Sequence, residues 1–369
     1  MAELGPAIHG GNVYAASRGL RRPISGVLDF SASINPLGPS PKAIKAAIQG
    51  LSALSHYPDP ECWEIRRGLA LRWKLSPEHF VIGNGSTELI DLLPRALTIR
   101  RALILGPTFS EYARAMARAK GRSTNLLATR RDGYRPPLDK AIELVQVSRR
   151  GRQPIDALVL CHPNSPTGQV CEAADLVKLV RSADRLGIWT ILDETFAEYC
   201  QDRSMLSRCA RYGRLIVLRS FTKFYALPGL RIGYMVASKE TSRRVLAVQP
   251  PWSVNALAQQ AAAAALSDRG HARRSLVYTQ KERERFITRL RLIPGLRVFP
   301  SHANFLLLEL PQSYRASQLT NVLARQGLLI RDCSSVPGLN EHTIRVAVRT
   351  SKENDLLSAA LNTQLSKGR

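Results

Sequence analysis

Two ionisable side chains follow short apolar runs, where charged groups are rarely buried without a role. Lys223 comes shortly after the run Leu215–Leu218. A desolvated lysine has a lowered pKa, and its neutral amine can form a Schiff base with a carbonyl compound. Asp193 ends the run Trp189–Leu192. A carboxylate buried there needs a partner, and a pyridinium nitrogen is one such partner. The alternatives for Asp193 are a helix N-cap and a structural ion pair.

Other residues could hold a phosphate or a ring oxygen. Gly85 and Ser86 lie in the turn G-N-G-S-T-E (83–88), between an apolar run and a helical pattern. Free N–H groups at such a helix start can bind phosphate, although a turn of this kind is more often only a turn. Arg231 could bind the same phosphate through two parallel hydrogen bonds. Asn164, in N-S-P-T-G, could bind a ring oxygen or simply shape the loop.

Taken in chain order, these residues form one coherent set: Gly85, Ser86, Asn164, Asp193, Ser220, Lys223, Arg231 and, far downstream, Arg345. The set offers a phosphate site, a ring-oxygen donor, a ring-nitrogen acceptor, a Schiff-base lysine and a distal arginine for a carboxylate. Coincidence is a poor explanation of all of them together. The sequence therefore predicts an enzyme that uses pyridoxal 5'-phosphate (PLP).

Short apolar runs that alternate with amphipathic stretches are the elements that must position this set. Strands are expected near 80–82, 102–105, 157–160, 189–192, 215–218 and 232–236, with helices such as 112–119 and 173–186 between them. This alternation predicts a mostly parallel sheet with helices on both faces, whose ligands sit at the carboxyl ends of the strands. A long helix near 252–266 would leave this sheet, and strands near 296–299, 305–310, 328–330 and 343–348 predict a second, smaller α+β unit.

The predicted domain limits follow from this pattern. Residues 1–40 would form an arm with little regular structure that joins the small domain, 41–250 the large cofactor-binding domain, and 251–369 the small domain.

Composition restricts the other possibilities. The net charge of the 369-residue chain is +24, but the basic residues are spread along the chain without interleaved aromatics, so no specific nucleic-acid site is expected. None of the six cysteines forms a C-x-x-C pair, so we expect no metal site and reduced thiols in the cytoplasm. We expect neither a signal peptide nor a membrane-spanning segment.

Several motifs resemble those of a known superfamily. N-S-P-T-G (164–168), L-D-E-T (192–195), S-F-T-K (220–223) and G-L-R-I-G (229–233) together resemble fold-type I PLP enzymes of the class I/II aminotransferase superfamily. The similarity runs from about residue 9 to residue 349. Within the superfamily, residues 9–12, 29–38, 218–231 and 251–255 resemble the threonine-phosphate decarboxylases of cobalamin biosynthesis most, and the histidinol-phosphate aminotransferases next.

The resemblance implies a cofactor site. Its members would be Lys223, Asp193, Asn164, Phe109, Gly85, Ser86, Ser220, Arg231 and Tyr57. Lys223 would carry the Schiff base, Asp193 would hold the ring nitrogen, and Phe109 would stack on the ring. Tyr57 would reach the cofactor phosphate from the other subunit, which implies a homodimer with shared active sites.

The resemblance also implies a substrate and a reaction. Arg345 would bind the substrate carboxylate, and Arg331 with His9 the substrate phosphate. The reaction would be decarboxylation of L-threonine O-3-phosphate to (R)-1-amino-2-propanol O-2-phosphate. Phe196 replaces a tyrosine that many aminotransferases have, which favours the decarboxylases; Tyr225 is another candidate hydroxyl. The alternatives are an aminotransferase for histidinol phosphate or a related compound, and an inactive regulator, which the complete lysine site disfavours.

Overall fold

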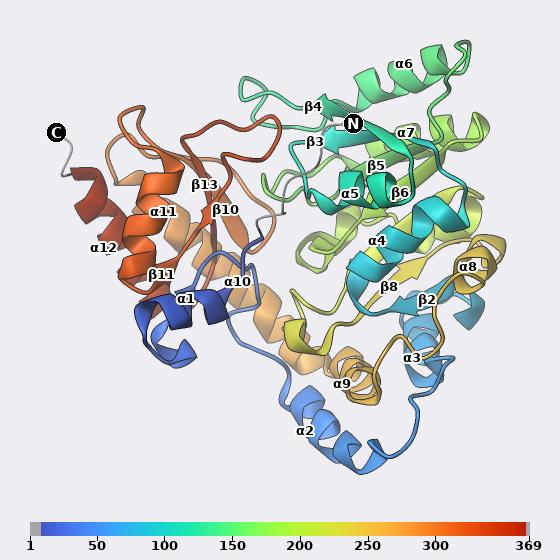
Figure 1. The fold of residues 1–369 in the computed structure, drawn as a ribbon, viewed down its shortest axis with the longest axis horizontal. Coiled ribbons are helices and arrows are strands. Elements are labelled where there is room, and N and C mark those ends of the chain that lie inside the picture. The colour runs from blue at the N-terminus through green and yellow to red at the C-terminus, as the bar shows by residue number, and fades with distance from the viewer. Residues whose placement is uncertain (1–8, 367–369) are drawn as a thin grey trace.

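A seven-stranded sheet forms the centre of the larger of two lobes in the computed structural model, which describes residues 9–366 (Figure 1). The strand order is β2-β8-β7-β6-β5-β3-β4, and all neighbours are parallel except β8, which is antiparallel to both of its neighbours. The strands are β2 (Phe80–Gly83), β3 (Arg101–Gly106), β4 (Arg122–Leu127), β5 (Ala157–Cys161), β6 (Trp189–Asp193), β7 (Leu215–Ser220) and β8 (Gly233–Val236).

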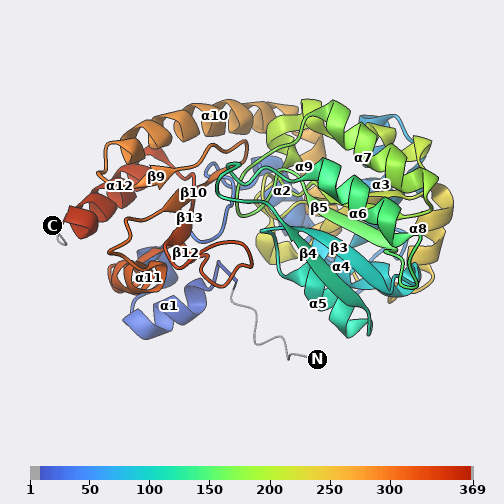
Figure 2. The same cartoon turned by 90° about the horizontal axis from the view of Figure 1, so that it is seen from above.

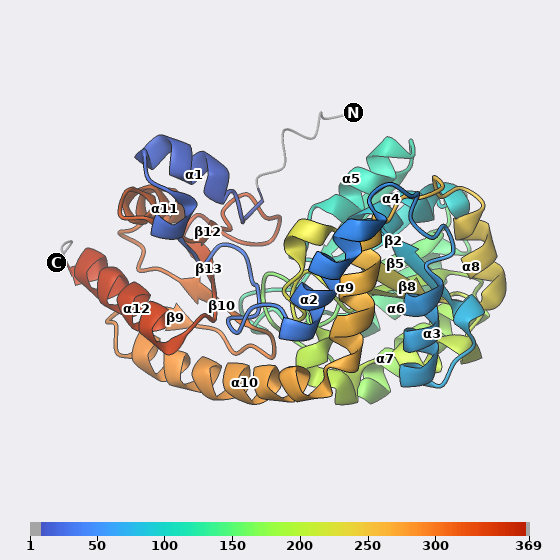
Figure 3. The same ribbon diagram turned by 90° about the horizontal axis from the view of Figure 1, so that it is seen from below.

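Helices cover both faces of this sheet and bury all of its strands except the edge strand β4, as the continuous apolar runs of the buried strands require. One face packs against α4 (Gly85–Ala96), α5 (Glu111–Arg118) and α8 (Lys239–Leu246). The other packs against α3 (Trp63–Trp73), α6 (Leu138–Ser148), α7 (Ala173–Arg185) and α9 (Ala256–Ser267). Helix α2 (Pro41–Gln49) lies beside α9 on the outside of the lobe (Figure 3).

The smaller lobe is built on an antiparallel sheet with its own core. The strand order is β12 (Arg331–Asp332), β13 (Thr343–Ala347), β10 (Phe305–Glu309) and β9 (Arg297–Val298). Its helices are α11 (Ala316–Arg325), α12 (Ser351–Ser366) and α10 (Arg269–Arg291), which arches across from the large lobe (Figure 2). Near the N-terminus, β1 (Leu28–Asp29) pairs in parallel with β11 (Leu328–Leu329) of this lobe.

The predicted fold class is confirmed, with local differences. Strand β4 was missed because its residues are mostly polar and exposed at the sheet edge. Helix α1 (Val13–Leu20) forms in the segment expected to be irregular, where Asn12 caps its first turn. Helix α9 begins at Ala256 and stays beside α2 and α3, so α10, and not the stretch 252–266, leads to the small lobe.

Residues 1–8 of the expected arm lie outside the described residues, and the domain limits stay a prediction. Within 9–366, no helix is long and apolar enough to cross a membrane.

Candidate active site

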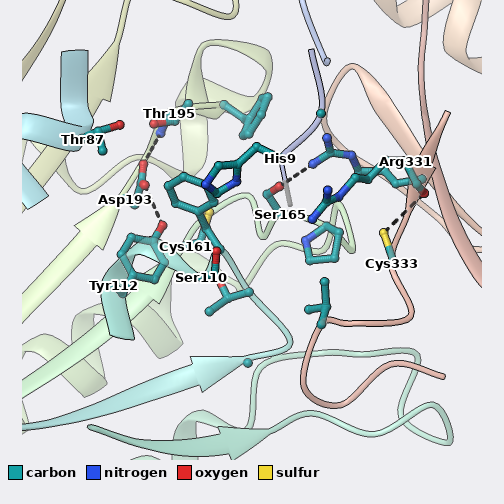
Figure 4. Close-up of a pocket in the computed structure, with 18 of the residues that line it drawn as sticks. His9, Thr87, Ser110, Tyr112, Cys161, Ser165, Asp193, Thr195, Arg331 and Cys333 are labelled. Atoms are coloured by element: carbon teal, nitrogen blue, oxygen red, sulfur yellow. Dashed lines mark hydrogen bonds between the residues drawn. The ribbon is translucent and has the colours of Figure 1, made fainter. Parts of the chain in front are cut away.

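The carboxyl ends of the central strands and the small lobe enclose a cavity of about 560 Å³. Nine of the twelve site residues predicted from the sequence line it: His9, Ser86, Phe109, Asp193, Ser220, Lys223, Arg231, Arg331 and Arg345. They come from both lobes and from the segment before α1 (Figure 4). This is the strand edge at which ligands bind in open α/β sheets.

Lys223 follows β7 and projects into the cavity from a loop that the N-terminal segment holds in place. The backbone N–H of Asn35 donates to the carbonyl of Lys223 at 3.0 Å. Burial, reinforced by the positive charges of Arg345 and Arg231, lowers the pKa of Lys223 to about 8. A substantial fraction of Lys223 is therefore a neutral amine near pH 8, which is the form that attacks a carbonyl carbon.

The low pKa of Lys223 predicts a pH-dependent stability of the cofactor-free protein. In the unfolded chain this lysine keeps its proton up to about pH 10.5, whereas in the folded protein it loses it near pH 8. Burial of the charged amine therefore destabilises the fold below pH 8, and the penalty fades as pH rises towards 10.5. Lys223→Met should be more stable than wild type at pH 7 by about 2 kcal/mol. This difference in unfolding free energy is smaller than the shift in the pKa of Lys223 alone would give, because the side chain is partly solvated.

Urea unfolding at pH 7 to 10.5 measures this difference, which should shrink as pH rises. Lys281→Met, on the exposed side of α10, is the control. A gap between wild type and Lys223→Met that stays constant over the range would contradict the low pKa.

Asp193 ends β6 with its carboxylate buried at the base of the cavity. Oδ2 accepts a 2.6 Å hydrogen bond from the hydroxyl of Tyr112, and Oδ1 accepts the backbone N–H of Thr195 at 3.0 Å (Figure 4). Burial raises the pKa of Asp193 above its ordinary value, and these donors act against the rise. Within the described part of the chain Asp193 has no ion-pair partner, so a ligand that brings a positively charged N–H would complete the site.

An anion site lies where α4 begins. Gly85 has a positive φ of 75°, and a Cβ built there would lie 2.6 Å from Nη2 of Arg231, so only glycine allows the guanidinium so close. Ser86, Ser220 and Arg231 all line the cavity nearby. The helix N-terminus, two hydroxyls and a guanidinium together suit a phosphate group.

Two arginines face each other on the small-lobe side. The register of β12 and β13 places Arg331 opposite Arg345, and both line the cavity. Arg345 donates to the hydroxyl of Ser165 at 3.0 Å and to the carbonyl of Ser31 at 2.8 Å, but its buried Nε has no hydrogen-bond partner. Like charges directly opposite each other are unfavourable, and neither guanidinium is ion-paired to a carboxylate of residues 9–366. The pair therefore suits a substrate with two anionic groups.

The other residues named from the sequence either lie outside the cavity or contact other groups of the protein. Tyr57 is 81% exposed, outside the cavity, with its ring 4.8 Å from that of Trp252. Asn164 is buried behind the wall, where its Oδ1 accepts hydrogen bonds from Thr167. His9 reaches the wall, and its Nε2 lies 3.1 Å from Oε1 of Glu111. Tyr225 supplies no hydroxyl to the cavity, because it packs in the core against Phe221 and Phe224.

Sequence reasoning missed Tyr112 and Ser165, which contact Asp193 and Arg345. Tyr112 was visible only as the first residue of an amphipathic stretch, and Ser165 only as part of a loop motif. The position of Tyr112 three residues after Phe109 was the one available signal, because it puts both aromatic rings beside the same cavity.

The group that this site would hold has a carbonyl, a basic ring nitrogen and a phosphate. PLP has all three, and Lys223, Asp193 and the anion site at Gly85 and Arg231 offer a partner for each. Among residues 9–366 no cluster of possible metal ligands occurs.

The large mixed sheet, the small antiparallel lobe and the lysine-lined cavity between them define fold type I of the PLP-dependent enzymes. The chain belongs to the family "Aminotransferase class I and II", whose sequence profile matches residues 25–361. The predicted superfamily is therefore confirmed.

Threonine-phosphate decarboxylases and histidinol-phosphate aminotransferases are two groups among the similar proteins. A threonine-phosphate decarboxylase of Salmonella typhimurium is 36% identical over 360 residues, which cover 97% of this chain and 96% of that protein. The crystal structure of L-threonine-O-3-phosphate decarboxylase from Porphyromonas gingivalis matches with a TM-score of 0.80 and 28% identity, covering 91% of this chain and 99% of that one. Histidinol-phosphate aminotransferase from Clostridium acetobutylicum matches with a TM-score of 0.85 and 28% identity, covering 92% and 100%.

Proposed function

We propose that this protein is a PLP-dependent decarboxylase of L-threonine O-3-phosphate, which yields (R)-1-amino-2-propanol O-2-phosphate for cobalamin biosynthesis. The observation that carries the proposal is the arginine pair Arg331 and Arg345 at one end of a cavity whose other end holds Lys223 and Asp193. The 36% identity over nearly the whole chain to a threonine-phosphate decarboxylase supports the same substrate.

Each residue of the site would have a separate task. Bound PLP supplies an electron sink for the negative charge that develops at the substrate Cα. Asp193 would hold the ring N–H, and Ser86, Ser220 and Arg231 the cofactor phosphate. Asn164 would bind the ring oxygen once its side chain turns from Thr167 towards the cavity, and Phe109 would stack on the ring. Lys223 would bind the cofactor and later deliver a proton to Cα.

The two arginines would decide which bond at Cα breaks. How the protein orients the substrate at the bound cofactor would therefore select the reaction. Arg345 would bind the substrate carboxylate and fix its orientation, which would direct cleavage to the bond between Cα and the carboxylate. Arg331 and His9 would fix the phosphate at the other end, so that the substrate cannot rotate.

The test of this function is dependence on a 2-oxo acid. The decarboxylase consumes phosphothreonine without one, whereas an aminotransferase needs one to regenerate its cofactor. Consumption of histidinol phosphate only when a 2-oxo acid is added would replace the decarboxylase with the aminotransferase that the second group of relatives suggests.

The working form would be a homodimer in the cytoplasm. An apolar surface runs along α2 and the residues after it, made of Ile44, Ile48, Leu51, Leu54 and Trp63, each between 46% and 65% exposed. Exposed apolar residues gathered in this way are typical of an interface. Tyr57 lies in the same stretch, and a second copy seated on this surface would bring it to the partner's cofactor phosphate.

Shared sites predict complementation between inactive variants. Tyr57→Ala and Lys223→Ala should each be nearly inactive, but an equal mixture refolded together should recover about a quarter of wild-type activity, because half of the dimers are hybrids with one intact site. Tyr14→Ala, which removes a tyrosine that is 64% exposed on α1, is the control and should stay active. Hybrids that form but recover no activity would rule out sharing.

A further inference from the structure

Tyr112 contacts the carboxylate at the base of the cavity. It lies in the first turn of α5, is 3% exposed, and also forms part of the cavity wall. Its hydroxyl donates to Oδ2 of Asp193 at 2.6 Å, while the backbone N–H of Thr195 donates to Oδ1. Groups of the protein itself therefore fix both oxygens of Asp193 in one orientation.

Other ionisable groups lie around this pair but none neutralises it. Cys161 pairs with Asp193 in the register of β5 and β6, and burial raises the pKa of its thiol, which therefore stays protonated. Glu194 is already paired with Arg219 at 2.8 Å, both fully buried. Lys223 is near enough for its pKa to respond to Asp193, but it forms no ion pair with it within the described residues. Asp193 therefore relies on hydrogen bonds to remain an anion.

We propose that Tyr112 is a positioning residue that keeps Asp193 ionised and directed at the ring nitrogen of the cofactor, and so sets the pH range over which PLP binds. The inference rests on the proposed cofactor site and adds a residue to it. A buried carboxylate is costly as an anion, and each donor offsets part of that cost. Without the hydroxyl, Oδ2 would lose its partner in a place that water does not easily reach.

The consequence is a shift in the pH dependence of cofactor binding. Burial raises the pKa of Asp193, and the hydroxyl of Tyr112 counteracts this rise, so Tyr112→Phe should raise that pKa further. In the variant, cofactor binding must then remove a proton from Asp193 at pH values at which Asp193 of the wild type is already ionised. The fall of PLP affinity on acidification should therefore begin about one pH unit higher in the variant, the size expected for a hydrogen bond to a charged group.

The experiment is a titration of the cofactor-free protein with PLP at pH 4.5 to 8, followed by tryptophan fluorescence and by the absorbance of bound cofactor. Tyr134→Phe is the matched control, because Tyr134 is also 3% exposed but packs against Phe299 at the lobe boundary. Tyr112→Phe should shift the midpoint of the acid limb, and Tyr134→Phe should not. In an Asp193→Asn background the shift caused by Tyr112→Phe should disappear.

The outcomes separate this inference from the proposed function. A wild-type protein that binds no PLP overturns both. The role of Tyr112 alone is overturned if the wild type binds PLP but Tyr112→Phe has the same midpoint. It is also overturned if Tyr112→Phe binds PLP more weakly by the same factor at all pH values. If Tyr112→Phe does not fold, a ring-fluorinated tyrosine can be placed at position 112 instead. Its hydroxyl is a stronger hydrogen-bond donor, so the midpoint of the acid limb should move to lower pH. A midpoint that does not move overturns the inference.

Discussion

Lys223→Ala should abolish the covalent attachment of PLP and lower kcat by at least about a thousandfold, since it removes both the attachment point and the proton carrier. The wild-type protein should be yellow, and borohydride should fix the cofactor to a peptide that contains Lys223. The variant should still fold, because the change removes a desolvated charge from the cavity and no ion pair of the described structure.

Lys178→Ala is the control for this experiment. Lys178 is 61% exposed on α7 and contacts Asp139 on the surface, so its loss should leave both cofactor content and turnover unchanged. Labelling of a different lysine in the wild type would show that the cofactor site has been assigned to the wrong place.

Plain threonine should be at least about a thousandfold poorer than its phosphate in kcat/KM. Threonine has no anion for Arg331, which would be left desolvated and unpaired opposite Arg345 in the complex. Arg331→Gln should reduce kcat/KM for phosphothreonine by about two to three orders of magnitude and change the low rate with threonine little, so most of the selectivity should vanish.

Steady-state kinetics with both substrates measure this selectivity. Arg315→Ala removes another arginine of the small lobe, which is 59% exposed and paired with Glu341, and should leave both rates unchanged. Comparable turnover of threonine and phosphothreonine by the wild type would overturn the assignment of Arg331 to the substrate phosphate.

The fold and the position of Asp193 and Lys223 at the cavity were predictable because their signals are local. Strands buried on both faces read as continuous apolar runs, and the residues that follow them, such as Asp193 and Lys223, fall at one edge of a parallel sheet. Strand β4 has a polar edge sequence and gave no such signal. Helix α1 is short and exposes all of its residues at least partly, and the Gly, Pro and Ser residues around it led to the prediction of an irregular arm.

The arrangement of the two arginines in the cavity required knowledge of distant contacts. Arg331 and Arg345 were named through resemblance, but their placement opposite each other depends on the register of two strands that a long loop separates. The bonds from Arg345 to Ser165 and to the carbonyl of Ser31 join three parts of the chain. The contact between Tyr112 and Asp193 spans 81 residues and is formed only when α5 packs on the sheet. No local pattern encodes such contacts.

At this site we expect the bond between Cα and the carboxylate to be the one that breaks. The direct measurement is the stoichiometry of CO₂ released from carboxyl-labelled phosphothreonine, with no 2-oxo acid present, against the amine phosphate formed. We expect one CO₂ for each amine phosphate, through many turnovers and without loss of bound PLP. Retention of the labelled carboxylate, with amino-group loss that depends on an added 2-oxo acid, would contradict it.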